Sequence, residues 1–485
     1  MDSLQFLSAR RVVSHHKSLW NSLPSLPSHF FPILFQAAFQ DGRALILRDL
    51  VASWPFPTLK FPKMGMAKKE GIFRDQEGKI CIQAVILEVV EQIRKDLEEP
   101  GRNSRCQLHL LDLTDLQDSS SSSFSCQIPN GISLWSSTVS IAKASLEISK
   151  HFQEFQSQFQ PHSNPWESPK GIQILTDLSV NSTSYGIVRD ALRIGNSGIF
   201  RIQCREFRAE ELSLLGILTL LDFLDPSGLK RVDLRFNNLG ISGLAKVLPK
   251  LSRFSELTSL RIPYSNVDVK KIKEGEEFGI RRIGKSLGML RKLKEINLGS
   301  SRLSGKLPEI LGYLQNPLES LELAFCSLLP SDLSFLSQTF HCHSLKKLDL
   351  SGHRFSQEFF QTFQQLLEKS SSSLIHLELL ECHLDDSHLD SLLPLFQTCS
   401  RLRFLGLTGN FFSFGALQNF LWKTLDLPEL SLVVYPEPLE CCEEIGMDRE
   451  VVSKELSERL QNLGRTNVVW TSRLYGNGVR ECFGL

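Results

Sequence analysis

The chain has 485 residues and a formal net charge of zero, because 54 Lys and Arg balance 54 Asp and Glu. At ~150 residues per domain, this length predicts about three domain-sized units or one long repeat array. The balanced charge argues against nucleic-acid binding, and no apolar run reaches the ~20 residues of a transmembrane helix. The 11 cysteines include no Cys-x-x-Cys pair. With no recognisable signal peptide, they indicate reduced thiols and a cytoplasmic protein.

Residues 1–100 predict a helical N-terminal cap. Apolar residues recur at helical spacing, and they predict helices over residues 3–13, 28–39, 43–53 and 80–97. No repeat is visible in this part of the chain. We expect these helices to pack against the first repeats of the region that follows.

The first predicted helix places Leu4, Ser8 and Val12 on one face, at positions i, i+4 and i+8. This row resembles the BC-box, a helix that inserts its leucine into a pocket of elongin C. Further along, Leu26-Pro27-x-x-Phe30 resembles the cullin-2 box. Docking of a helix into a groove needs such an apolar row. The pattern is degenerate, however, and on these residues alone a helix that simply packs within the cap is the favoured alternative.

Residues 101–228 predict degenerate repeats and linkers. Strand-like segments occupy residues 108–113, 172–178 and 199–204, and an apolar helix follows over 209–224. Five consecutive serines, Ser119–Ser123, and the Gln-, Pro- and Ser-rich stretch Gln156–Gly171 interrupt them. Such compositions are typical of exposed loops or linkers.

Residues 229–427 contain seven copies of the pattern Leu-x-x-Leu-x-Leu-x-x-(Asn or Cys)-x-Leu. The copies start at Leu229, Leu257, Leu293, Leu318, Leu345, Leu374 and Leu402. This period predicts an α/β fold, a leucine-rich repeat solenoid with parallel strands on its concave side and helices on its convex side. The second copy is the longest, and we expect its charged surplus, Asn266–Lys285, to form a protruding loop.

The side chain at the ninth position of each copy is expected to form hydrogen bonds with backbone groups that are left unpaired where the strand turns away. It is occupied by Asn237, Ser265, Ser301, Cys326, His353, Cys382 and Asn410. The two cysteines there are expected to be buried structural thiols rather than reactive ones.

Residues 428–485 predict one more degenerate repeat and a C-terminal cap. A strand-like segment lies within Leu427–Val434, an acidic and helix-like stretch spans Glu437–Glu458, and a final strand is expected at Asn467–Trp470. A cap is needed because an open solenoid end would expose its core.

No enzyme signature is present. The sequence lacks the glycine-rich phosphate loops, the zinc-protease motif and the nucleophile elbow. His341-Cys342-His343 has no distant second pair of ligands, so it predicts a turn rather than a zinc site. We therefore expect no catalytic, metal-binding or cofactor-binding residues, and no cofactor.

The strand residues that flank the inward leucines alternate in charge from repeat to repeat. Such a mosaic suits a protein partner rather than a phosphate backbone, although an ordinary solvated face is the alternative. The candidate partner-binding residues on the concave face are Arg231, Arg235, Arg261, Glu319, Glu322, Lys346 and Arg403.

Four blocks of sequence resemble the PRAME family along the whole chain. They are LPSHFFPILFQAAFQDGRALILRDLVASWPFP, LKRVDLRFNNLGISGL, NPLESLELAFCSLLPSDLSFL and VVWTSRLYGNG. The resemblance implies a ribonuclease-inhibitor-like horseshoe. It also implies a substrate receptor of cullin-2 and elongin B/C ubiquitin ligases, with Leu4, Ser8 and Val12 as the box and Leu26, Pro27 and Phe30 behind it. Ser8 stands where such boxes often have Cys.

Within the family, these blocks resemble a member associated with dampening Toll-like receptor signalling to NF-κB. This resemblance implies binding to the β subunit of the inhibitor-of-κB kinase, which disturbs assembly of the kinase core. The first hypothesis is therefore a non-catalytic adaptor that occludes this kinase subunit. The alternative is a ligase substrate receptor, and the two are compatible.

Overall fold

The structure is a computed structural model of the chain. It describes residues 3–16, 20, 22–61, 72–99, 105–114, 136–158, 171–194, 199–271, 277–424, 427, 429–441, 454–455, 458 and 469–471. The chain divides into two compact units, residues 1–230 and residues 231–485. Within the described residues, every helix is too short or too polar to cross a membrane.

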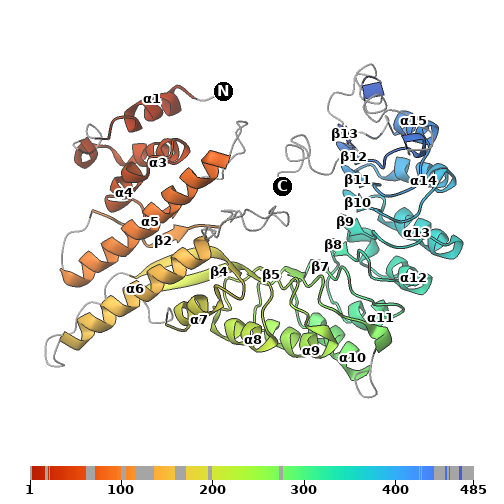
Figure 1. Cartoon of the computed structure of the whole chain (residues 1–485), viewed down its shortest axis with the longest axis horizontal. Helices are drawn as coiled ribbons and strands as arrows, with labels where there is room; N and C mark the ends of the chain where they lie inside the picture. Colours follow the sequence, from red (N-terminus) through yellow and green to blue (C-terminus); the bar gives the residue numbers. More distant parts are fainter. Residues whose placement is uncertain are drawn as a thin grey trace. The chain divides into compact units, whose positions relative to one another are not determined.

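Unit 1 combines helices with a short parallel sheet (Figure 1). Its strands are β1 (Thr58–Lys60), β2 (Leu110–Asp112), β3 (Ile172–Val180) and β4 (Phe200–Ala209), paired in that order. Its α-helices are α1 (Leu4–Val13), α3 (Phe31–Gln40), α4 (Ala44–Ala52), α5 (Ile72–Glu98), α6 (Ser137–Gln158), α7 (Tyr185–Ile194) and α8 (Leu214–Phe223), with 3-10 turns at Leu23–Ser25 and Ser28–Phe30.

Unit 1 differs from the sequence expectation in two elements. The first 100 residues are not purely helical, because β1 buries Leu59 as the first strand of the sheet. A three-residue strand is too short to show alternation. The helix α6 was not predicted, and it extends to Gln158, inside the expected linker. Its many serines have modest helix propensity and obscure the buried Ile141 and Ile148. The serine run and residues 159–170 lie outside the described residues.

Unit 2 repeats one strand and one helix along its length. All strands pair in parallel, residue for residue, and they are β5 (Arg231–Asp233), β6 (Ser259–Arg261), β7 (Glu295–Asn297), β8 (Ser320–Glu322), β9 (Lys347–Asp349), β10 (His376–Glu378), β11 (Phe404–Gly406), β12 (Leu432–Val434) and β13 (Val469–Thr471). The central residue of each strand from β5 to β12 is buried. The strand positions expected from the repeats, and the two strands expected after residue 427, are therefore confirmed.

The helices of unit 2 are α9 (Gly240–Leu251), α10 (Glu277–Gly288), α11 (Leu307–Leu311), α12 (Pro330–Gln338), α13 (Gln357–Ser370), α14 (Asp386–Thr398) and α15 (Phe414–Lys423), with 3-10 turns at Val269–Lys271, Cys342–Ser344 and Leu439–Cys441. Figure 1 shows α11 to α15 on one side of the strands they follow, which leaves the other face of the sheet without helices. This alternation confirms the predicted leucine-rich repeat solenoid.

One expectation for unit 2 was wrong. The charged stretch Asn266–Lys285 is not a single loop, because α10 begins at Glu277. Ile280, Ile283 and Leu287 are buried at helical spacing, although charged neighbours mask this period in the sequence. Most of the predicted acidic segment 437–458 lies outside the described residues.

Candidate partner-binding surfaces

The parallel register of unit 2 aligns the outward side chains of successive strands into rows. The residues that precede the buried central position form a first row of Arg231, Ser259, Glu295, Ser320, Lys347, His376 and Phe404. The residues that follow it form a second row of Asp233, Arg261, Asn297, Glu322, Asp349 and Glu378. Each charge therefore has neighbours from the adjacent strands at ~4.8 Å strand spacing.

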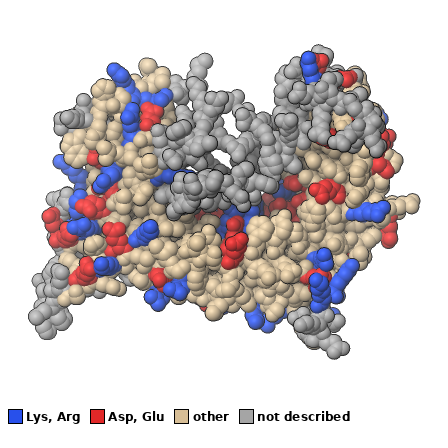
Figure 2. Space-filling view, in the orientation of Figure 1, with Lys and Arg blue, Asp and Glu red and all other residues tan. Residues whose placement is uncertain are grey.

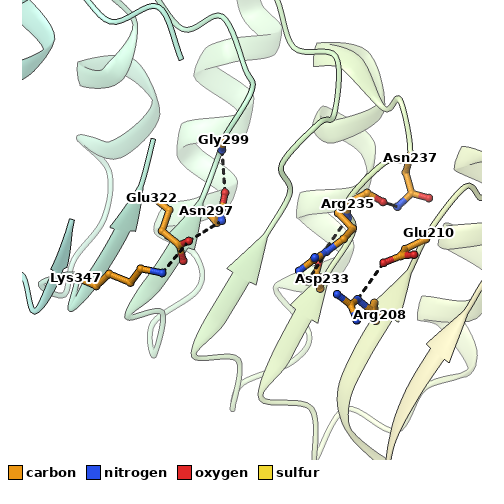
Figure 3. Close-up of polar contacts among 9 residues, drawn as sticks. All are labelled: Arg208, Glu210, Asp233, Arg235, Asn237, Asn297, Gly299, Glu322 and Lys347. Atoms are coloured by element: carbon orange, nitrogen blue, oxygen red, sulfur yellow. Dashed lines mark hydrogen bonds and ion pairs between the residues drawn. The ribbon is translucent and has the colours of Figure 1, made fainter. Parts of the chain in front are cut away.

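A continuous relay of polar contacts crosses β7 to β10, and Figure 3 shows its first part, from Asn297 to Lys347. The Asn297 side chain accepts from the backbone N–H of Gly299 at 2.9 Å and donates to Glu322 at 3.0 Å. The Lys347 ammonium lies 3.1 Å from the Glu322 carboxylate and 3.8 Å from that of Glu378. The charges on these strands thus hold one another in place before any partner binds.

The relay ends on an aromatic contact. His376 Nε2 lies 2.6 Å from the Glu378 carboxylate, and its ring stacks on Phe404 with 4.0 Å between ring centroids. Neither residue was among the candidates chosen from sequence. The signal was present, since both occupy the first outward position of their repeats.

Most of the predicted concave-face residues pair with neighbours. Glu319 accepts from Lys294 at 2.8 Å and from Lys346 at 2.6 Å, and these hydrogen bonds lower the pKa of its carboxyl. Arg403 bonds to Glu429 at 2.9 Å, and Arg235 bonds to Asp233 of its own repeat. The alternating charges are therefore largely matched within the protein, which the sequence pattern did not indicate. Whether they contact a partner stays a prediction.

One predicted arginine differs from this pattern. Arg261 is exposed at its strand and forms no ion pair within the part of the chain that the structure describes, while Arg231 is also exposed. Figure 2 shows blue and red side chains intermingled on the face in view. Such a mixed surface suits recognition of a protein rather than attraction of a polyanion.

Asp349, on β9 in the second row, is a buried carboxyl with a shifted pKa. Its residue surface is only 8% exposed, and Glu322 and Glu378 occupy the same position on the neighbouring strands. Burial, and then the negative charges of Glu378 and Glu322, raise the pKa of Asp349 to about 6. At neutral pH the fold therefore holds an ionised carboxylate in an unfavourable place.

We expect Asp349→Asn to be more stable than the unsubstituted protein at pH 7. The folded-state pKa lies above the unfolded one, so the ionisation of Asp349 lowers the free energy of unfolding as pH rises from about 4 to about 6, with little change above. The gain at pH 7 is about 3 kcal/mol. Urea unfolding midpoints at pH 4 and pH 7 measure this effect. The control is Glu368→Gln, which changes an exposed carboxyl. An equal difference between Asp349→Asn and the parent at pH 4 and pH 7 would contradict the assignment.

Three aromatic residues follow the strands of unit 2, and sequence reasoning missed them. Phe236, Tyr264 and Phe325 occupy the eighth position of their repeats and are 46%, 52% and 45% exposed. Their φ angles of 58°, 56° and 56° are left-handed, at a cost of about 1 kcal/mol each. We call these three residues the aromatic rim.

The N-terminal helix α1 presents the predicted box outward. Phe6, Ala9 and Val13 are buried, and α1 packs on α3. On the other face, Ser8 is exposed, and Leu4 and Val12 are 82% and 45% exposed. The helix does pack within the cap, as the favoured alternative from sequence expects, but it packs through a different face and leaves the row of Leu4, Ser8 and Val12 outward.

Polar contacts fix α1 at both ends. The Ser3 hydroxyl accepts from the backbone N–H of Phe6 at 3.2 Å and caps the helix. Arg10 forms a forked bond with Asp41, at 3.1 and 2.7 Å, and His16 lies 2.6 Å from Asp49 of α4. The outward row is thus carried by a positioned helix.

The second predicted motif lies just before α3. Leu26 is half-buried, while Pro27 is exposed and Phe30 is 42% exposed. The Phe30 ring lies against His29, with 4.1 Å between ring centroids. These residues therefore also reach solvent from the 3-10 turns between α1 and α3.

The cysteines and histidines singled out in the sequence lie in surroundings typical of structural residues. Cys326 and Cys382 are buried, and burial raises the pKa of each thiol to about 12, which keeps both protonated. His341 stands just before the 3-10 turn Cys342–Ser344, which precedes β9, and it accepts from the backbone N–H of Leu318 at 3.2 Å. Among the described residues, no cluster of three or more His, Cys, Asp or Glu could hold a metal ion.

The matches to known proteins span the chain. The model of the PRAME N-terminal domain matches residues 3–120, and that of the PRAME C-terminal domain matches residues 196–481. The chain is 43% identical to leucine-rich repeat-containing protein 14 of Xenopus laevis over 98% of both chains, and 37% identical to that of Homo sapiens over 100% of both. It is 27% identical to human PRAME family member 7, covering 90% of this chain and 85% of that one. The chain therefore belongs to the PRAME family.

Proposed function

We propose that this protein is a non-catalytic adaptor that docks elongin B/C and cullin-2 through α1 and holds a second protein on the concave face of unit 2. The observation that carries the proposal is the outward placement of Leu4, Ser8 and Val12 on a helix whose other face is packed. An exposed leucine row on an anchored helix is what helix-in-groove docking requires.

Leu4 is the residue of this row that exposes the largest fraction of its surface to a partner. It is 82% exposed in the first turn of α1, and burying a leucine side chain stabilises a complex by about 2 kcal/mol. Ser8 donates to the backbone carbonyl of Leu4 at 2.9 Å, so its hydroxyl already has an acceptor within the helix. A neutral, internally bonded serine can therefore enter an apolar pocket at lower cost than a free hydroxyl.

We expect Leu4→Asp to weaken binding of purified elongin B–C complex to the full chain by at least about 100-fold, because a buried unpaired carboxylate costs several kcal/mol. Isothermal titration calorimetry measures this directly. The matched control is Leu215→Asp, which changes a similarly exposed leucine of α8 and should leave binding unchanged. Equal affinity of the two variants, or no binding by the unsubstituted chain, would show that α1 is not the dock.

The partner that the family resemblance implies for the concave face is the β subunit of the inhibitor-of-κB kinase. Occupation of this subunit would disturb assembly of the kinase core and dampen Toll-like receptor signalling to NF-κB in the cytoplasm. The relay from Asn297 to Glu378 supports a protein partner, because a pre-arranged mosaic of charges favours a matching surface. Under this proposal, the protein can act both as an adaptor and as a ligase receptor, because the two roles use different surfaces.

A further inference from the structure

The aromatic rim is not required by the turn that it occupies. The same position of the other repeats holds Gly352 and Gly409, with φ angles of 73° and 75°, and the smaller or polar Ser300 and Glu381, with φ angles of 59° and 53°. Glycine adopts this conformation without a steric penalty. Phe236, Tyr264 and Phe325 take it with a bulky side chain. Where a repeat tolerates glycine, an exposed and strained aromatic side chain indicates a role outside folding.

The rings are held in place on one side and open on the other. Phe236 stacks on Tyr264 with 4.6 Å between ring centroids and 18° between ring planes. The Phe325 ring lies across Gly352, where an added Cβ would come within 2.1 Å of it. Each ring nevertheless stays about half exposed. Rigid aromatic side chains of this kind lose little conformational entropy on binding, and they are typical binding hot spots.

From Tyr264 to Phe325 the residues that precede the rim positions are uncharged. Pro263, Gly299 and Ala324 stand just before Tyr264, Ser300 and Phe325. Arg235, just before Phe236, is paired with Asp233. From β5 to β8 the rim crosses three strand spacings, which is ~14 Å at ~4.8 Å each. An extended peptide covers that distance in about four residues.

The second row next to the rim becomes acidic toward β10. Glu322, Asp349 and Glu378 follow one another on β8, β9 and β10, and Lys347 is the cation that lies between Glu322 and Glu378. Three carboxylates against one ammonium leave this end negative. It therefore favours a cation and repels a phosphate backbone.

We propose that the aromatic rim and the acidic end of the second row form one binding site for an extended segment of a partner protein. The segment carries two apolar side chains about four residues apart, which cover the rings, followed within about three residues by Lys or Arg, which pairs with the carboxylates. The proposal rests on the proposed function of the concave face, and it names the chemistry that this face selects.

The test is selection of a random 12-residue peptide library, displayed on phage, against the full chain at pH 7. We expect enrichment of peptides with the apolar pair and the following Lys or Arg. Fluorescence polarisation with synthetic copies then measures their affinity. It should fall at least tenfold for Phe236→Gly, for Tyr264→Asn and for Glu322→Gln. Trp422→Ala, which removes an aromatic side chain of α15 that is 63% exposed, should bind as the parent does.

Melting temperatures separate a binding role from a structural one. Because Gly and Asn tolerate the left-handed backbone, Phe236→Gly and Tyr264→Asn should melt at or above the parent temperature. Lower melting temperatures in both variants, peptides that bind all variants equally, or no enriched peptide would each overturn the proposal. Elongin B–C binding by the same variants is expected to be unchanged, so a failure here is distinguishable from a failure of the α1 dock.

Discussion

Replacing Asp332 with alanine is expected to lower the free energy of unfolding of unit 2 by about 4 kcal/mol. The side chain is fully buried near the start of α12. Its two oxygens accept backbone hydrogen bonds from Gly305 at 2.7 Å, Leu307 at 3.1 Å and Leu329 at 2.9 Å. Alanine leaves three N–H groups of two successive repeats without this acceptor. The bond from Leu307 is buried and the other two are partly buried, and an unsatisfied buried group costs about 1–3 kcal/mol.

Urea unfolding followed by circular dichroism measures this effect. Asp385→Ala is the matched control, because Asp385 also accepts a backbone hydrogen bond at a helix start, from His388 at 3.1 Å, but does so at the surface. An exposed cap is worth about 1 kcal/mol. If the two alanine variants lost equal stability, Asp332 would be an ordinary cap rather than a link between repeats.

Gly284→Ala is expected to cost about 3 kcal/mol through overpacking. A Cβ at Gly284 in α10 would lie 2.1 Å from the backbone oxygen of Glu309 and 2.9 Å from the Tyr313 ring. One turn later, a Cβ at Gly288 would lie 2.5 Å from the backbone oxygen of Tyr313. The backbone of α10 thus approaches the next repeat too closely for any side chain, and the helices must move apart.

Thermal unfolding of Gly284→Ala against Gly186→Ala checks this claim. A Cβ at Gly186, in α7, meets no atom within 4 Å, so alanine there should be neutral or slightly stabilising. A melting temperature of Gly284→Ala equal to that of Gly186→Ala would mean that the close approach of α10 does not limit stability.

The sequence predicts the solenoid well because every repeat contains the same leucine pattern. Leu260 and Leu321, for example, stand at the same step of their copies, and both are buried centres of paired strands. The first 230 residues lack such redundancy. β1 is a single short strand, and α6 is hidden by serines, so neither has a second copy that would reveal it.

The candidate surfaces were predicted less completely than the fold. Periodicity places Glu319, Glu322 and Lys346 on the outward face, but it cannot show that these charges pair across strands, since pairing depends on register and rotamers. The aromatic rim needed backbone angles to be recognised as strained. For α1, spacing gave the row of Leu4, Ser8 and Val12, and only packing could show which face of the helix is free.

The most direct test of the adaptor proposal is a pull-down from cell lysate with the full chain and with Leu4→Asp. Blots for elongin C, cullin-2 and the kinase β subunit give three readouts in one experiment. We expect the unsubstituted chain to retain all three proteins, and Leu4→Asp to lose elongin C and cullin-2 while keeping the kinase subunit. If the unsubstituted chain retained neither elongin C nor the kinase subunit, the account of this protein as an adaptor between them would be contradicted.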